Sequence, residues 1–185
     1  MGDPSRTEEV DACNEAGRIC LEREDRQGAF EEFSRALDLL GEDPDPKRKA
    51  LLLNNLGRVQ VALDRRDEAL ATFQEAARLF EQIGDRTALG WQLGNVGSVY
   101  RDKEEHEAAL ESYKRALSVF EEQDHTIGIA DQYSNIGYIH AMKRERGVAL
   151  EFFRKAKGLY ESQGEETKAG LAEKNIRILS SRGNG

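Results

Sequence analysis

The sequence contains few residues whose types and spacing are typical of catalysis or metal binding. Its histidines are His106, His125 and His140, and none belongs to an HExxH pattern or to a Cys–His cluster with metal-ligand spacing. Acidic residues are so common that carboxylate pairs arise by chance, and no nucleophile is accompanied by a positioned base. We therefore predict that the protein is not an enzyme and that it binds neither a cofactor nor a metal.

The segment GWQLGNVG, residues 90–97, has the composition of a phosphate-binding glycine loop. Such a loop occurs once, follows a strand and is accompanied by a lysine or an acidic partner, and these features are missing here. Glycines recur instead at one constant spacing, at Gly17, Gly57, Gly97 and Gly137. Glycine inside a helix costs about 1 kcal/mol relative to alanine, so we expect close packing at these positions.

Composition and charge exclude several classes of protein. The chain has 185 residues, 34% of them charged, with only 3 prolines, which is typical of a helical protein. Its net charge of -8 argues against binding of nucleic acid, which requires a basic face. No segment is apolar enough for a membrane span or a signal peptide, so we predict no membrane partner and a cytoplasmic location. Cys13 and Cys20, seven residues apart on one helix, are expected to act as core hydrophobes.

Four further columns of residues share the 40-residue spacing of the glycines. Two columns contain only alanine and two contain large apolar or aromatic residues, in the order Ala29, Ala69, Ala109 and Ala149; Phe33, Phe73, Tyr113 and Phe153; Ala36, Ala76, Ala116 and Ala156; Leu40, Phe80, Phe120 and Tyr160. A repeat of this length accommodates two helices and two short turns. The pattern therefore predicts four helical hairpins.

The turn residues place the expected helices. Glycine ends a helix and aspartate caps the next at Gly84-Asp85, Pro44-Asp45-Pro46 is equivalent, and Gly164-Glu165 repeats the break. We expect first helices at 6–24, 46–63, 86–103 and 126–143, and second helices at 27–40, 67–83, 106–122 and 147–163. A ninth helix at about 166–180 carries Arg177 in place of the glycine, so it is expected to be a solvated cap.

These columns resemble the tetratricopeptide repeat (TPR), which has a glycine at its eighth position, alanines at its twentieth and twenty-seventh, and an aromatic residue at its twenty-fourth. The 40-residue length is similar to the repeat of Pins-type adaptor proteins, on the residues Gly84-Asp85-Arg86, Gly90 and Asn95-Val96-Gly97. The resemblance implies an all-α protein, an α-solenoid forming a right-handed superhelix of four helix-turn-helix hairpins plus a C-terminal capping helix. It also implies one domain, 1–185, with repeats at about 6–45, 46–85, 86–125 and 126–164.

In this family the first helices form a concave wall along which peptides bind. Asn55, Asn95 and Asn135 share one position of the repeat, two residues before the glycine, and Asn54 lies beside the first of them. A carboxamide both donates and accepts hydrogen bonds, so such a ladder could hold the backbone of an extended peptide. Three rungs would span roughly 6 to 12 residues. Alternatively, each amide bonds to the neighbouring hairpin.

Neighbouring positions on the expected wall mix aromatic, apolar and basic residues. Trp91 and Tyr138 could contact a peptide, and half-burial against the helix of Leu51 is the alternative for Trp91. Arg18, Arg58 and Arg101 could pair with an acidic peptide, or lie in solvent bonded to nearby glutamates. His140 is expected in the core or at the groove edge.

Two functions follow from this resemblance. The first is a monomeric protein–protein interaction adaptor that binds a short linear segment of a protein or peptide partner in the concave groove. The second is a self-associating or signal-peptide-sensing regulatory module. Exposed Leu171, Ile176 and Leu179 on the ninth helix would favour the second function, through a homodimer formed by that terminal helix.

Overall fold

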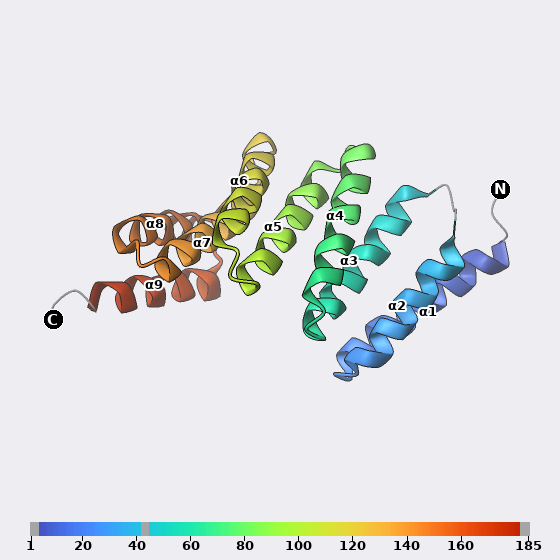
Figure 1. The fold of residues 1–185 in the computed structure, drawn as a ribbon. Helices are drawn as coiled ribbons and strands as arrows, with labels where there is room; N and C mark the ends of the chain where they lie inside the picture. The colour runs from blue at the N-terminus through green and yellow to red at the C-terminus, as the bar shows by residue number, and fades with distance from the viewer. Residues whose placement is uncertain (1–3, 42–44, 182–185) are drawn as a thin grey trace. The chain divides into compact units, whose positions relative to one another are not determined.

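A computed structural model describes residues 4–41 and 45–181, and all regular structure in these ranges is α-helical (Figure 1). The helices of the first two hairpins are α1 (Pro4–Glu22), α2 (Arg26–Leu40), α3 (Pro46–Ala62) and α4 (Arg66–Gln82). They are followed by α5 (Arg86–Asp102), α6 (His106–Glu122), α7 (Thr126–Met142), α8 (Arg146–Ser162) and α9 (Glu166–Ser181). The expected bounds agree with these within two residues, which confirms the all-α helical repeat.

The chain divides into two compact units, Met1–Gln92 and Leu93–Gly185, and the division falls inside α5. In the first unit α1 packs on α2, α2 on α3, and α3 on α4. In the second unit α6 packs on α7, α7 on α8, and α8 on α9. Helices that follow one another in the sequence are therefore neighbours in each unit, as expected for stacked hairpins.

Side chains at the helix starts act as caps. The Asp45 Oδ1 accepts hydrogen bonds from the backbone N–H groups of Lys47 (3.0 Å) and Arg48 (3.2 Å), and Pro46 occupies the first position of α3. Asp85 accepts from the N–H of Ala88 (3.0 Å). These contacts confirm the predicted capping aspartates; Pro44, expected in the turn before α3, lies outside the described residues. At the start of α7 the same role falls to a histidine.

That histidine is His125, whose Nδ1 accepts a hydrogen bond from the N–H of Gly128 (2.9 Å). It occupies the position of the repeat at which Asp45 and Asp85 stand in the two preceding units. A ring nitrogen that accepts this bond carries no proton, so the cap requires that Nδ1 be unprotonated. The helix start was predicted, but the capping role of this histidine was not.

The turns between α3 and α9 share one backbone conformation. A residue with positive φ follows the helices at regular intervals, at Asp64 (62°), Gly84 (76°), Glu104 (62°), Asp124 (48°), Arg144 (62°) and Gly164 (71°). The next N–H reaches back five residues, as in Arg65 to Gln60 (2.8 Å) and Glu105 to Tyr100 (2.9 Å). This is the Schellman arrangement that ends many helices, normally on glycine. The turns inside a hairpin and between hairpins are therefore alike.

Glu104→Gly is expected to raise the free energy of unfolding by about 0.5–1 kcal/mol. Glu104 has a φ of 62°, a conformation that costs a residue with a side chain about 1–2 kcal/mol. Glycine avoids this cost, but it loses more conformational entropy on folding, which offsets part of the gain. Urea denaturation followed by circular dichroism measures the change. Gly84→Ala is the matched control and should lower stability, because Gly84 has a φ of 76°, which alanine adopts only with strain. No atom lies within 4 Å of the added Cβ, so this backbone strain acts without a clash. A lower stability for Glu104→Gly would contradict the strain.

Each unit has its own core, built from the predicted columns. In the first unit, Phe33 and Ala29 of α2 pack with Leu56 and Val59 of α3. In the second, Tyr113 and Ala109 of α6 pack with Ile136 and Ile139 of α7. A further group joins α9 to α7 and α8; it comprises Ala130, Ala156, Tyr160, Ala169 and Ala172. Cys13 is buried and Cys20 is half-buried against the core, as expected for core hydrophobes.

The repeat glycines make room for the aromatic rings of the second helices. A Cβ built on Gly57 would lie 2.6 Å from a ring carbon of Phe73, and one on Gly97 would lie 2.7 Å from Tyr113. The same holds for Gly17 and Phe33, at 2.7 Å. Within each of these hairpins, the aromatic ring of the second helix fills the space that a side chain in place of the glycine would need. The segment at residues 90–97 is thus part of a packed helix, and the predicted packing role of its last glycine is confirmed.

Candidate functional site

The residues predicted to bind a peptide lie on one side of the first helices, which we call the amide face. On each first helix it consists of the residues six and two positions before the repeat glycine and one and four positions after it. On α3 these are Leu51, Asn55, Arg58 and Val61; on α7 they are Asp131, Asn135, Tyr138 and Ala141. The face is described for each unit by itself.

In the first unit the amides of three helices form a chain of hydrogen bonds. The Asn55 Nδ2 donates to the Oδ1 of Asn14 on α1 (3.2 Å), and the Asn54 Nδ2 donates to the Oδ1 of Asn55 (3.4 Å). The Gln92 Nε2 on α5 donates to the Oδ1 of Asn54 (3.0 Å). The alternative considered for these amides, bonding to a neighbouring hairpin, thus describes one bond of Asn55, to α1, and one bond of Asn54, from α5. Because a carboxamide offers two N–H groups and two lone pairs, these bonds use part of its capacity.

The other amide-face residues near these hydrogen-bonded amides are exposed or half-buried. Leu51 is 50% exposed, and Val61 is also exposed. Arg58 projects into solvent, whereas the exposed Arg18 donates to Glu15 (3.0 Å), as its alternative interpretation expected. Trp91 is half-buried on α5.

In the second unit the structure brings Arg101 and Tyr138 together. The Arg101 guanidinium lies over the Tyr138 ring, 5.9 Å from its centre, and also bonds to Asp102 (2.9 Å). Tyr138 remains 48% exposed, and Asn95 and Asn135 are half-buried. Asn55 belongs to the first unit and the other two asparagines to the second, so the three-rung ladder stays a prediction.

Asp131 belongs to the same face but is engaged within the protein. Its Oδ1 accepts hydrogen bonds from the Tyr160 hydroxyl (2.6 Å) and the Lys168 Nζ (2.9 Å). Burial and the bond to this carboxylate raise the pKa of Tyr160 well above its ordinary value. The carboxylate therefore links α7, α8 and α9 and has a structural role.

Helix α9 extends the amide face of the second unit. Its residues at the equivalent positions are Leu171, Asn175 and Ile178, and Leu171 is 58% exposed. Ile176 and Leu179, expected to be exposed with Leu171, are half-buried. Asn175 has the same position in the repeat as Asn135, and this match could have revealed the α9 part of the face from the sequence. Because a solvated cap was expected, the α9 residues were not included in the predicted site.

Gln132 shows what happens where the amide pattern is interrupted. It is 1% exposed, and its Oε1 has no hydrogen-bond partner among residues 4–41 and 45–181. It is the repeat equivalent of Gln92, and the residue facing it is Gly94, the equivalent of Asn54. The second unit therefore keeps the glutamine but lacks the asparagine that bonds it in the first.

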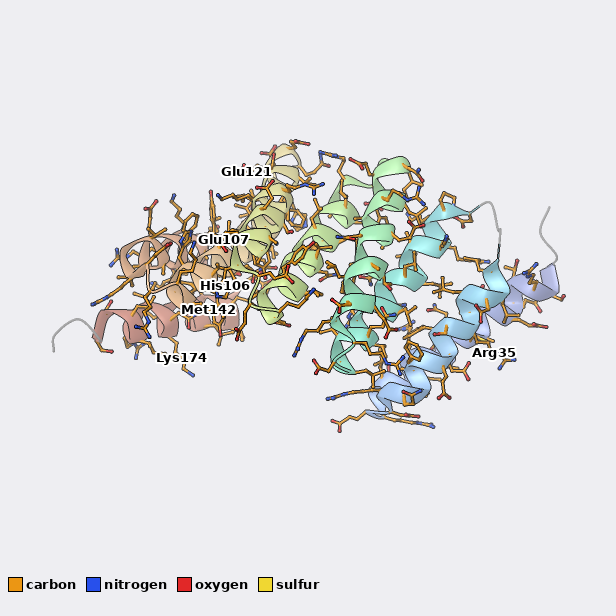
Figure 2. The ribbon with its side chains drawn as sticks, viewed as in Figure 1. Arg35, His106, Glu107, Glu121, Met142 and Lys174 are labelled. Atoms are coloured by element: carbon orange, nitrogen blue, oxygen red, sulfur yellow. The ribbon has the colours of Figure 1, made fainter. Side chains whose placement is uncertain are left out.

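The remaining candidate residues have no catalytic arrangement. His140 is half-buried, stacks on Phe152 with ring centres 5.6 Å apart, and bonds to Glu145, which lowers the pKa of that exposed carboxyl. The prediction of a core or edge position for His140 agrees with this placement. His106 is the first residue of α6, labelled in Figure 2. Across the described ranges no group of His, Cys, Asp or Glu side chains is arranged to hold a metal ion.

The repeat geometry agrees with comparisons with known proteins. The tetratricopeptide repeat family matches residues 11–82 and 86–162, which is most of the chain. The chain therefore belongs to the tetratricopeptide repeat family. No curated protein matches the sequence at a significant level.

Solved structures share this fold. The apo form of RapI superposes with a TM-score of 0.85 at 18% identity, covering 94% of this chain and 48% of RapI. Aspartyl phosphate phosphatase F from Bacillus subtilis gives 0.82 at 19%, covering 97% of this chain and 50% of its own. A STAND-type signal transduction ATPase from Pyrococcus horikoshii, which has a TPR sensor, gives 0.87 at 15%, covering 94% and 27%. The chain thus spans about half the length of the first two proteins.

The fold and family define a protein–protein interaction module. The TPR fold is typically a scaffold for interactions rather than for catalysis, so the functional surface is to be sought among exposed side chains. Among the described helices none is long and apolar enough to cross a membrane.

Proposed function

We propose that the protein binds a short, extended segment of a partner protein on the amide faces of its first helices. The observation that carries the proposal is where exposed apolar side chains gather. Of the large hydrophobic side chains exposed on the described helices, five occupy amide-face positions: Leu51 and Val61 of the first unit, and Tyr138, Leu171 and Ile178 of the second. Ile19 of α1 and Met142 of α7 are also exposed, at other positions of the first helices. Among the described residues, the second helices expose one large hydrophobic side chain, Val148.

Such a surface suits an extended peptide for two reasons. Exposed apolar side chains that gather on one face favour binding there, since they gain from burial by a partner. The half-buried amides beside them can bond the peptide backbone whatever its side chains, because the bonds of Asn55 to Asn14 and Asn54 use only part of its hydrogen-bonding capacity. Apolar contacts would supply affinity and amides would fix the position of the backbone.

The test separates binding by an amide from its structural role. An array of random peptides of about ten residues is probed with the wild-type protein and with Asn55→Ala, which we expect to reduce binding in the first unit by about tenfold, the loss of one or two hydrogen bonds. Asn14→Ala is the matched control, because it removes the same Asn55–Asn14 bond and leaves the Asn55 amide in place.

Equal losses in the two variants would show that the amide only supports the fold. For the second unit, Tyr138→Ser and Ile178→Ser are expected to weaken binding, with Val148→Ser as the control on a second helix. Asn55, Asn95 and Asn135 replaced together by alanine should abolish binding and keep the helical circular dichroism spectrum.

A second candidate is a self-associating or signal-sensing regulatory module. Leu171 and Ile178 are exposed on the last described helix, and the Pyrococcus horikoshii protein uses its repeats as a sensor. Light scattering over a range of protein concentrations tests self-association. A mass that stays monomeric at all concentrations would remove this candidate.

A further inference from the structure

Helix α3 presents a stripe of exposed side chains with basic ends and an apolar centre. At 100° per residue, Lys47, Leu51, Asn54, Arg58 and Val61 all project from one side. All except Asn54, which is half-buried, are exposed. This α3 stripe includes the amide-face residues of α3 apart from Asn55, which lies beside it.

The charge of α3 differs from that of the helices around it. Its charged residues are Lys47, Arg48, Lys49 and Arg58, and it contains no acidic residue. The second helices of the same unit carry most of their charge as carboxylates: Glu31, Glu32 and Asp38 on α2, and Asp67, Glu68, Glu75 and Glu81 on α4. A basic helix on a protein of net charge -8 indicates a local preference for an acidic partner.

Carboxylates near α3 are already paired. Asp11 of α1 contacts Arg48 (3.4 Å), and Glu15 contacts Arg18 (3.0 Å). On the other side Glu75 of α4 accepts two hydrogen bonds from Arg78 (2.8 and 2.9 Å) and lies 3.4 Å from Lys49.

The two cations of the α3 stripe, Lys47 and Arg58, are not paired with these carboxylates. In the part of the chain that the structure describes, Lys47 and Arg58 form no ion pair. At physiological salt charges are screened within about 8 Å, so the acidic outer helices, about one helix diameter away, offset these two cations only weakly.

A pocket adjoins the basic start of the α3 stripe. It has a volume of about 250 Å³ and is lined by residues of α1, of α3 and of the turn just before α3: Val10, Asp11, Asn14, Asp45, Lys47, Arg48, Leu51 and Leu52. Val10 and Leu52 are buried core residues, so the floor of the pocket is apolar. The two carboxylates of the lining are engaged, Asp11 with Arg48 and Asp45 with the backbone N–H groups at the start of α3. The space therefore accommodates one apolar side chain next to Lys47.

We propose that the α3 stripe selects an acidic linear segment, in which carboxylates pair with Lys47 and Arg58 and an apolar side chain packs on Leu51. Eleven residues of helix separate the two cations, about 16 Å along the axis, which an extended chain covers in about five residues. The inference rests on the proposed function, to which it adds the chemistry of the partner.

The experiment uses the same peptide array, now sorted by net charge at matched apolar content. We expect peptides with several Asp or Glu residues to bind at least tenfold more tightly than their Asn or Gln counterparts in 50 mM salt, and the difference to shrink strongly in 500 mM salt. Arg58→Glu and Lys47→Glu should each remove this preference. The matched control is Arg35→Glu, which makes the same charge change at an exposed residue of α2, outside the α3 stripe (Figure 2).

The outcomes separate the two proposals. Binding that is equal for acidic peptides and their amide counterparts, or that survives in Arg58→Glu, would overturn the inference and leave peptide binding intact. Loss of the preference in Arg35→Glu as well would also overturn it, because a general charge effect would then explain the result. An array without any bound peptide would overturn both.

Discussion

Gly97→Ala is expected to lower the free energy of unfolding by about 1–3 kcal/mol, although alanine is the better helix former by about 1 kcal/mol. A Cβ at this position would lie 2.7 Å from two ring carbons of Tyr113. That ring is fully buried and packs against Ile136 and Ile139, so it has no room to move aside. Urea denaturation followed by circular dichroism measures the loss.

Gly158→Ala is the matched control for this prediction. Gly158 also lies inside a helix, α8, but no atom lies within 4 Å of an added Cβ. Here only the helix preference acts, and stability should rise by about 1 kcal/mol. If both variants were stabilised, the Tyr113 ring would have to yield without cost, and the explanation of the glycine column by packing would be wrong.

Asp131→Ala should destabilise the protein by about 1–3 kcal/mol and loosen α9. The variant removes the carboxylate that accepts the hydrogen bond of the buried Tyr160 hydroxyl, which keeps its contact with Ser134, and it removes the partner of Lys168. Loss of a buried hydrogen-bond partner costs about 1–3 kcal/mol. Denaturation gives the energy, and hydrogen exchange shows whether the amides of α9 lose protection. Unchanged exchange in α9 would mean that the alanines of its core hold it alone.

The repeat supplies a control at the equivalent position of its first unit. Asp11 also pairs with a cation from the next first helix, Arg48, at 3.4 Å. Its side chain, however, is 61% exposed, whereas that of Asp131 is 21% exposed. Because exposed ion pairs contribute about 0–1 kcal/mol, Asp11→Ala should change stability little. The contrast isolates burial, since sequence position in the repeat is the same.

The helices could be predicted from the sequence because several signals agree. The columns of Gly57 and Phe73, the capping Asp45 and Asp85, and the break at Gly84 each mark the same phase of the 40-residue repeat. The left-handed conformation of Glu104 and Arg144 could not be predicted, since neither residue type prefers it. There the packing of the flanking helices imposes the turn.

The candidate site could be predicted by position but not by contact. The repeat placed Asn55, Arg58 and Tyr138 on one side of their helices, which needs only the helical period. The bond from Asn55 to Asn14 depends on side-chain rotamers across two hairpins, which no repeat pattern specifies. The part of the face on α9 was missed because Arg177, in the glycine position, indicated an end to the repeat.

The even spacing of the left-handed turns bears on how such a chain can lengthen or shorten during evolution. From Asp64 to Gly164 each reversal follows the last after the same stretch of chain, whether it closes a hairpin or joins two. A recombination event that copies or removes two consecutive helices therefore preserves the spacing of the turns, whichever helix the copied or removed pair begins with. Because the turn within a hairpin and the turn between hairpins are alike, turn geometry does not restrict the pair that is gained or lost to one beginning with a first helix.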